Sequence, residues 1–395
     1  MISTVELNKI FEKDSFMEIG AGMKCSVITG YGRIGDKMVY AFLQDSERED
    51  GAFSKTAASK IKAVYELALK ARIPVVGLLD STGYLIEEGA EALNGFSEVY
   101  ALANKARESI LQIMVVGGKC MGQMVSLAGT ADFFFKDMEL DEAFSKTREL
   151  IRVLPSAKGD IPEQFETKDD LNRLIPGISQ MIDSGRDILK AISDDGFLIE
   201  TDEDKAPELT TGFIKINGLM VAAIANNMTE NGNRMGLEAL NKAVKLVDTA
   251  GKFRLGIVKI SNTDGIQITE DQNLIVSASG RLWDAFSKAK VPMIDVITGN
   301  VMGGAYSLMN GRGTSTDLTF AWKDARINII NPRQAADILY GPLDETNIVE
   351  KTREYEETHS VAAILEEKGL VDKVIEPEET RKYVAGALES YANIY

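Results

Sequence analysis

The feature of this sequence that most restricts its fold is an internal repeat. The segment TGYGRIGDKMVYAF contains Gly30 and is matched by TGFIKINGLMVAAI, which contains Gly212, 182 residues later (212 − 30). The segments VVGLLDSTG and IVKISNTDG end at Gly83 and Gly265, again 182 residues apart (265 − 83). A constant spacing at separated points indicates that one structural unit was duplicated.

A third pair of segments supports the same repeat but leaves its register open by one residue. The segment KCMGQMVSLAGTADFFF parallels NVMGGAYSLMNGRGTSTDLTFAW. Gly122 aligns with Gly304 at a spacing of 182 or with Gly303 at a spacing of 181.

Each copy of the repeat has the pattern of an α/β unit. Short, fully apolar runs predict buried parallel strands, and apolar residues at helical spacing predict the helices between them. For the first copy we expect strands at 26–30, 38–44, 75–79 and 112–116, with helices at 54–71 and about 87–105. The first two strands flank the turn signal Gly35-Asp36 and should form a hairpin-like pair, as should their counterparts in the second copy. For the second we expect strands at 255–260 and 293–298, with helices at 237–250 and near 276–289. Alternating strands and helices predict a parallel sheet with right-handed crossovers.

The length of the chain, 395 residues, also favours two domains, because a single hydrophobic core rarely grows that large. A polar, acidic stretch at about 155–210 with three prolines joins the two copies. We place the boundary near residue 190, which gives domains at 1–190 and 191–395.

Composition and charge exclude several classes of function. The net charge of −16 argues against nucleic-acid binding, which needs clustered Lys and Arg. His359 is the only histidine, and the two cysteines, Cys25 and Cys120, lack zinc-ligand spacing, so we expect no metal site. Two cysteines, no signal-like N-terminus and no long apolar run favour a cytoplasmic protein.

The first candidate site is the segment Val301-Met302-Gly303-Gly304-Ala305-Tyr306, which follows a buried strand and opens a helix. Paired glycines let the backbone approach a ligand closely, and the N–H groups at a helix start lack partners within the helix. Such donors can form an oxyanion hole for a thioester oxygen. Glycines needed only for tight packing of the helix on the strand are an equally good interpretation.

The counterpart in the first copy is Gly118-Lys119-Cys120-Met121-Gly122-Gln123. It has one glycine where the second copy has two, and Gln123 adds bulk where a thioester would approach, so we expect this site to be the weaker one. Cys120 lies in an apolar turn, where a small buried side chain is favoured over a nucleophile.

A third candidate is the loop Asp80-Ser81-Thr82-Gly83-Tyr84 at the carboxyl end of an expected strand, where ligands of open α/β sheets bind. Glu87, Glu88 and Glu91 follow it and could act as a general acid or base. Acidic residues in a first helical turn more often stabilise the helix dipole.

The order of these segments resembles the carboxyltransferase family of the crotonase-like superfamily, whose members serve biotin-dependent acyl-CoA carboxylases and decarboxylases. The resemblance runs through GYGRIGDKMVYAFLQD, IPVVGLLDSTGYLIEEG, VPMIDVITGNVMGGAYSLM and LTFAWKDARINII to VAAILEEKGLVDKVIEPEETRKYVAGALE. It implies two tandem crotonase-like domains of ββα repeats, the first holding acyl-CoA and the second holding biotin.

The resemblance also implies a mechanism in which backbone donors stabilise an enolate and no histidine is needed. It assigns one oxyanion hole to Gly303, Gly304 and Ala305, and the other to Gly122 and Gln123. Further contacts to the CoA thioester or to biotin are expected from Gly83, Tyr84, Gly265 and Tyr306. The implied partners are a biotin carboxyl carrier protein, an acyl-CoA and further copies of the chain, from a dimer to a hexamer. A membrane would be reached only through a partner subunit of a decarboxylase.

The chain departs from the family pattern in its first copy. Gln123 replaces a family glycine, and DMELDEAFSKTRELIRVLPS follows Phe135 where the family has Gly-rich structure. A non-catalytic scaffold or regulatory subunit of the same fold is therefore an alternative. A crotonase-like hydratase or hydrolase that uses Glu87 or Glu88 is a further one.

Overall fold

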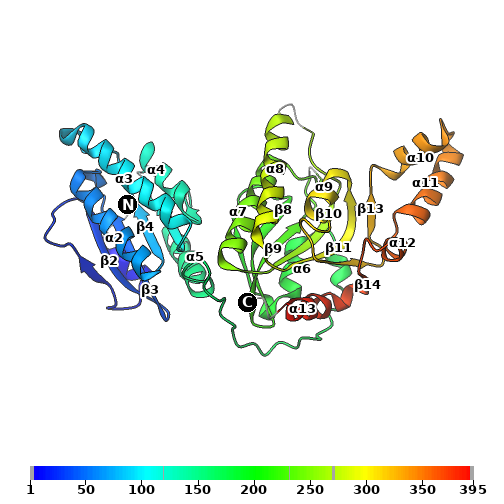
Figure 1. The fold of residues 1–395 in the computed structure, drawn as a ribbon, viewed down its shortest axis with the longest axis horizontal. Helices are drawn as coiled ribbons and strands as arrows, with labels where there is room; N and C mark the ends of the chain where they lie inside the picture. The colour runs from blue at the N-terminus through cyan, green and yellow to red at the C-terminus, as the bar shows by residue number, and fades with distance from the viewer. Residues whose placement is uncertain (1–3, 119, 231, 269–271, 392–395) are drawn as a thin grey trace. The chain divides into compact units, whose positions relative to one another are not determined.

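The computed structural model describes residues 4–118, 120–230, 232–268 and 272–391, and the chain divides into two compact units (Figure 1). The first unit is Met1–Ile161 and the second is Pro162–Tyr395. The boundary expected near residue 190 lies inside the second unit, because the helix Gly185–Ile192 packs on the sheet of that unit.

The first unit contains α1 (Thr4–Ile10), β1 (Met17–Ile19), β2 (Val27–Ile34), β3 (Lys37–Gln44), α2 (Lys55–Ala71), β4 (Val75–Leu79), α3 (Ala90–Arg107), β5 (Gln112–Val116), α4 (Gln123–Ser126), β6 (Phe133–Phe135) and α5 (Leu140–Val153). The second unit begins with α6 (Gly185–Ile192), β7 (Leu198–Thr201), β8 (Leu209–Ile216), β9 (Leu219–Asn226), α7 (Leu237–Phe253), β10 (Ile257–Thr263), α8 (Gln272–Ala289) and β11 (Met293–Met302). It continues with α9 (Gly303–Met309), β12 (Leu318–Trp322), β13 (Arg326–Asn328), α10 (Pro332–Tyr340), α11 (Glu345–His359), α12 (Ala362–Glu367), β14 (Lys373–Ile375) and α13 (Thr380–Ser390).

The two sheets have the same strand order and the same strand directions. The first sheet runs β1-β2-β3-β4-β5-β6, and the second runs β7-β8-β9-β10-β11-β12 with β14 added at its end and β13 beside β11. In each sheet the first three strands are antiparallel and the next three join them in parallel. The expected duplication of one α/β unit is confirmed, and the expected hairpin-like pair makes each sheet mixed.

The register of the strands repeats as well. Glu18 lies opposite Gly30 in the first sheet, and Glu200 lies opposite Gly212 in the second, a shift of 182 for both partners (200 − 18, 212 − 30). At β5 and β11 the shift is 181, because these strands start at 112 and 293 (293 − 112). The second copy therefore lacks one residue between its second crossover helix and the following strand. This deletion aligns Gly122 with Gly303 and settles the register that the sequence left open.

A close backbone contact explains the glycine that marks each repeat. A Cβ atom on Gly30 would lie 2.3 Å from the carbonyl oxygen of Met17, and one on Gly212 would lie 2.3 Å from that of Ile199. Each contact comes from the short strand that pairs at the edge of the sheet. Any side chain at either position would push that strand away.

Apolar side chains and a helix cap explain the main elements. Helix α2 begins where the Ser54 hydroxyl accepts a hydrogen bond from the Ala57 N–H, and β4 and β5 are buried on both faces. In the second unit α6 and α13 share one core cluster with alternate residues of β8 to β11. No helix in the described ranges is long and apolar enough to cross a membrane.

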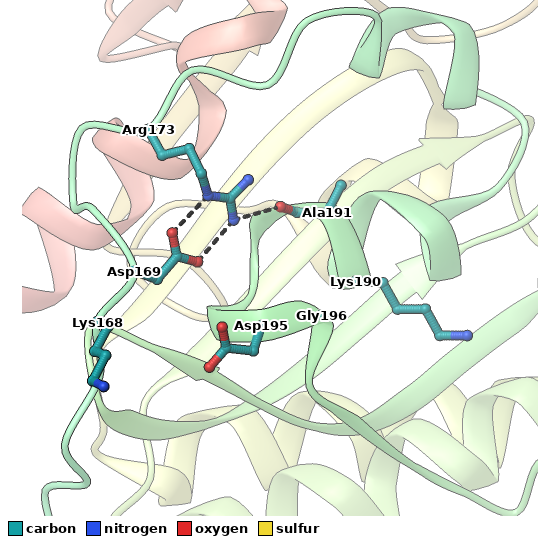
Figure 2. Close-up of a pocket in the computed structure, with 7 residues that line it drawn as sticks. All are labelled: Lys168, Asp169, Arg173, Lys190, Ala191, Asp195 and Gly196. Carbon is teal, nitrogen blue, oxygen red and sulfur yellow. Dashed lines mark hydrogen bonds and ion pairs between the residues drawn. The ribbon is translucent and has the colours of Figure 1, made fainter.

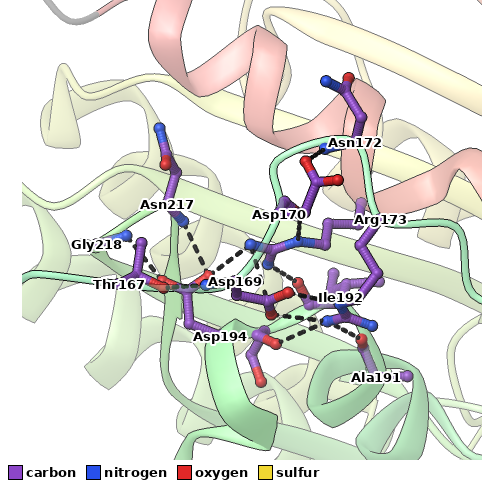
Figure 3. Close-up of polar contacts among 12 residues, drawn as sticks. Thr167, Asp169, Asp170, Asn172, Arg173, Ala191, Ile192, Asp194, Asn217 and Gly218 are labelled. Atoms are coloured by element: carbon purple, nitrogen blue, oxygen red, sulfur yellow. Dashed lines mark hydrogen bonds and ion pairs between the residues drawn. The ribbon is translucent and has the colours of Figure 1, made fainter.

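A buried arginine joins the C-terminal helix of the second unit to the segment that precedes its sheet. Arg381 on α13 has no exposed surface, and its guanidinium donates to the Asp194 carboxylate at 2.7 Å and to the carbonyl oxygen of Asp170 at 3.0 Å. Asp194 also accepts from the N–H groups of Asn217 and Gly218 (Figure 3). The segment around Asp170 is thereby fixed on its own unit.

Candidate active site

The second unit holds the paired-glycine turn in the position that the sequence predicts, between β11 and α9. Gly303 has a φ of +57°, and a Cβ atom there would lie 3.1 Å from the carbonyl oxygen of Ile329, so both the backbone and the space require glycine. Gly304 and Ala305 follow in the first turn of α9, where N–H groups have no acceptor within the helix. The turn therefore presents backbone donors of the kind an oxyanion hole needs.

The loop after β10 lies against this turn. Gly265 has a φ of +117°, and its N–H donates to the Thr263 hydroxyl at 3.3 Å. The next residue, Ile266, has its Cδ1 atom 3.7 Å from the position that a Cβ atom on Gly304 would take. Two of the predicted site residues, Gly265 and Gly304, are thus brought together by the fold.

A chain of polar side chains fixes this loop and the turn to each other. Asn300 donates from its side chain to Asp264 at 2.8 Å and accepts from the Asn328 side chain at 2.9 Å. Asn328 in turn accepts from the Ser360 hydroxyl at 2.5 Å. Sequence reasoning missed Asn300 and Asn328, although asparagines at the carboxyl ends of strands are the signal that could have pointed to them.

Tyr306, the fourth residue of α9, has a partly structural role. It packs against the core cluster that contains Val301 and Ala321. Burial raises the pKa of its hydroxyl, so the phenol stays protonated near neutral pH. Its position one turn beyond Gly303 keeps this protonated hydroxyl within the site region.

The first unit has the same turn with different side chains. Gly122 has a φ of +58°, close to that of Gly303, and no atom lies within 4 Å of the place a Cβ atom would take. Gln123 stands where the second unit has Gly304. Its side-chain oxygen accepts a hydrogen bond of 2.6 Å from the Tyr84 hydroxyl. The glutamine side chain is therefore held toward Tyr84 rather than left free beside the turn.

The loop that carries Gly83 and Tyr84 repeats the loop of the second unit. Gly83 has a φ of +137° and its N–H donates to the Ser81 hydroxyl at 3.2 Å, as Gly265 does to Thr263. Tyr84 meets Phe53 and Phe96 edge to face, and burial raises the pKa of its hydroxyl. A protonated phenol is the form that donates to Gln123.

Several other candidate residues of the sequence have contacts within the protein. Glu88 accepts from the Lys55 N–H at 2.5 Å at the start of α2, and Glu91 pairs with the Lys55 ammonium at 2.9 Å. Cys120 is buried, and burial raises the pKa of its thiol, which disfavours the reactive thiolate. His359 stacks on Tyr355 within α11. In the described part of the chain no group of acidic, histidine or cysteine side chains could hold a metal ion.

A cavity that the sequence did not predict lies in the second unit, and none of its lining residues belongs to the glycine turn of that unit. It has a volume of about 480 Å³ and is lined by Lys168, Asp169, Arg173, Lys190, Ala191, Asp195 and Gly196 (Figure 2). Asp169 and Arg173 form a two-point ion pair at 2.7 and 2.9 Å. These two charges are therefore paired with each other at the wall of the cavity.

Fold, repeat and paired turns together define a tandem α/β protein with backbone donors at equivalent places in both units. The family model described as "Carboxyl transferase domain" matches residues 4–139 and, in a second match, residues 123–394. The chain belongs to this carboxyl transferase family.

Relatives of known activity match along most of the chain. It is 27% identical to the propionyl-CoA carboxylase beta chain of Roseobacter denitrificans, over 93% of this chain and 83% of the relative. It is 28% identical to the methylmalonyl-CoA decarboxylase subunit alpha of Veillonella parvula, over 100% of this chain and 90% of the relative. A solved structure of the transcarboxylase 12S hexamer with methylmalonyl-CoA bound shares the fold, with a TM-score of 0.91 at 24% identity, over 98% of this chain and 89% of that one.

Proposed function

We propose that this protein is the carboxyltransferase subunit of a biotin-dependent enzyme and moves a carboxyl group between carboxybiotin and an acyl-CoA. The observation that carries the proposal is the strand, glycine turn and helix that recur at Gly122 and Gly303 in a chain of this family. Both turns have the backbone conformation that leaves helix-start donors facing a ligand oxygen.

The two turns would have separate roles. The N–H groups of Gly303, Gly304 and Ala305 would stabilise one oxyanion, and those of Gly122 and Gln123 the other. Removing one such donor typically costs about 2.7–4 kcal/mol of barrier. Backbone N–H donors suit an oxygen acceptor such as that of a ureido group or a thioester. The glycine of each turn has no side chain that would block the approach of this oxygen. Biotin, when bound on its carrier, supplies the carboxyl group that is transferred.

The neighbouring residues complete the proposed site. Gly83 and Tyr84 in the first unit and Gly265 and Tyr306 in the second would contact the CoA thioester or biotin. By resemblance the first unit holds acyl-CoA and the second holds biotin. No histidine takes part, which agrees with a mechanism that uses backbone donors.

The partners follow from the same proposal. A biotin carboxyl carrier protein would present the cofactor, and copies of the chain would form a dimer or a larger ring up to a hexamer, the state of the transcarboxylase 12S core. We place the enzyme in the cytoplasm, where its free thiols Cys25 and Cys120 stay reduced.

A non-catalytic scaffold is the weaker proposal. Two sequence features favour it: Gln123, whose side chain would obstruct the thioester, and the segment after Phe135, which departs from the family pattern. Gln123 is held by Tyr84, and the open space around Gly122 is kept. The similarity to enzyme subunits covers 93 to 100% of the chain, so the segment after Phe135 does not interrupt it.

Carboxyl transfer to free biotin tests the proposal. The purified full chain is incubated with biotin and carboxyl-labelled methylmalonyl-CoA, and label in biotin is measured against a reaction without protein. We expect transfer by the wild type and none by Gly304→Val, whose side chain would enter the turn. Absence of transfer to free biotin and to a biotinylated carrier, together with no binding of any acyl-CoA, would support the scaffold instead.

A further inference from the structure

A cavity of about 430 Å³ in the first unit begins beside the Gly122 turn. It is lined by Tyr84, Leu93, Phe96, Ser97, Tyr100, Gln123 and Ser126. These residues come from the loop after β4, from one side of α3 and from α4. We call this space the α3 cavity. Because Gln123 follows Gly122 directly, the cavity opens where the proposed function places the thioester.

The walls of the α3 cavity are apolar and aromatic. Phe96 meets Tyr84 edge to face with ring centroids 5.8 Å apart, and its centroid lies 6.2 Å from that of Tyr100. None of the lining side chains carries a charge. A carboxylate or ammonium group would lose hydration there without gaining a charged partner, so the cavity disfavours charged ligands.

Most polar groups of the cavity are already bonded within the protein. The Ser97 hydroxyl donates to the carbonyl oxygen of Leu93 at 3.2 Å, and the Ser126 hydroxyl donates to that of Gln123 at 2.6 Å. The Tyr84 hydroxyl donates to the side-chain oxygen of Gln123. The cavity can therefore receive an apolar group without leaving these donors unpaired.

The volume of the α3 cavity determines how large a ligand group it can hold. One water molecule occupies about 30 Å³ of liquid, and a methyl group is of similar size. The α3 cavity is therefore far larger than the single methyl group that a propionyl thioester would place beyond its α-carbon. An acyl chain of several carbons would fill it.

We propose that the α3 cavity binds the acyl chain of the substrate beyond its α-carbon and selects uncharged chains of about four to eight carbons. This inference rests on the proposed function and deepens it by naming the substrate class. Each buried methylene group should tighten binding by about fourfold. Tyr84 and Gln123 are the specificity-determining pair, since their hydrogen bond forms the wall next to the turn.

Binding of acyl-CoAs to the full chain, measured by isothermal titration calorimetry, tests the inference. The ligands are propionyl-, pentanoyl-, hexanoyl- and glutaryl-CoA. We expect hexanoyl-CoA to bind at least tenfold more tightly than propionyl-CoA. We expect glutaryl-CoA, which ends in a carboxylate, to bind at least tenfold more weakly than pentanoyl-CoA.

A variant that fills the cavity gives the second test. Leu93 lines the cavity and is 49% exposed, so Leu93→Trp should fill part of the cavity with its larger side chain without disturbing the core. It should weaken hexanoyl-CoA binding at least tenfold and change propionyl-CoA binding less than threefold. Leu67→Trp on α2 is the matched control, because Leu67 is 42% exposed and does not line the cavity.

The outcomes separate the inference from the function on which it rests. The inference would be overturned if all four thioesters bound with equal affinity, or if Leu93→Trp left hexanoyl-CoA binding unchanged. In either case, propionyl-CoA binding together with carboxyl transfer would still support the proposed function. If no acyl-CoA binds to the wild type, both are overturned.

Discussion

Among single residues, Lys259 occupies the most unusual environment. It lies fully buried in the middle of β10 and donates to the carbonyl oxygens of Met309 and Ser315 and to the Thr316 hydroxyl. Met309 is the last residue of α9 and the other two acceptors follow this helix, so the ammonium holds the end of the helix that begins at the glycine turn. In the first repeat Gly77 takes the equivalent position (259 − 182), and no lysine is available there.

Burial of Lys259 predicts a pH dependence of stability. Desolvation lowers the pKa of its ammonium from 10.5 to about 8, although Asp295 and Asp317 act in the opposite direction. Between these two values the unfolded chain binds more protons than the folded one, so this group makes stability rise with pH. Relative to Lys259→Met, the wild type should gain about 2–3 kcal/mol of unfolding free energy from pH 7 to pH 10.

Urea unfolding of wild type and Lys259→Met at pH 7, 8.5 and 10 measures this gain. The exposed Lys105→Met is the control, and its difference from wild type should stay constant. If the Lys259→Met difference is also constant over this range, the lysine does not titrate between 8 and 10.5 in the folded protein.

The two adjacent glycines of the second turn should respond differently to alanine. Gly303→Ala places a side chain at a φ of +57° and 3.1 Å from the Ile329 carbonyl oxygen, which should cost about 1–3 kcal/mol. Gly304→Ala makes an ordinary contact of 3.7 Å with Ile266, and alanine has the higher helix propensity, so stability should stay unchanged or rise by up to about 1 kcal/mol. Thermal unfolding of both variants compares them, and equal losses would contradict the observed turn geometry.

At the scale of elements, one buried ion pair adds to the apolar packing that attaches α13 to its unit. Arg381→Leu would leave the buried Asp194 carboxylate with only its two backbone donors. Losing one partner of a buried ion pair costs about 3–5 kcal/mol, and the segment around Asp170 would lose its anchor. We expect faster cleavage of this segment in limited proteolysis and a lower midpoint in urea.

The control for this prediction is an exposed arginine. Arg353 pairs with Glu357 at 2.7 Å on the surface of α11. Arg353→Leu should change stability by less than about 1 kcal/mol, because exposed ion pairs contribute little. Similar effects of Arg353→Leu and Arg381→Leu would show that the buried network is not what holds α13.

At the scale of the whole molecule, exposed apolar side chains on the second unit favour assembly. The segment from β13 to α11 exposes Ile329, Ile338, Leu339, Tyr340 and Val349, and Ile338 is 73% exposed. Large apolar side chains gathered on a surface are typical of interfaces. We expect light scattering to report at least a dimer for the wild type. The double variant Ile338→Asp, Val349→Asp should have a lower mass in solution. Leu67→Asp, on a helix of the first unit, should leave the mass unchanged, and a monomeric wild type at micromolar concentration would refute the assembly.

Much of the architecture could be predicted from the sequence because it depends on local patterns. The strands Val75–Leu79 and Gln112–Val116 have the expected bounds, since each is a short apolar run between turn residues. Helix α3 begins three residues later than expected and β11 continues four residues further, as element ends depend on tertiary contacts. The hairpin-like pair expected at the start of each copy is confirmed, whereas the short antiparallel strands β1 and β7 beside these pairs were not predicted.

The sequence by itself determined the duplication, the order of elements and the position of both glycine turns, because these features are carried by spacing along the chain. Only the tertiary structure decided that Gly122 matches Gly303, because the register of the strands shows where the deletion lies and sequence similarity does not. The bond between Tyr84 and Gln123 and the burial of Lys259 were likewise decided in three dimensions. Their partners lie 39 to 57 residues away, and only the packing of strands and crossover helices brings such residues together.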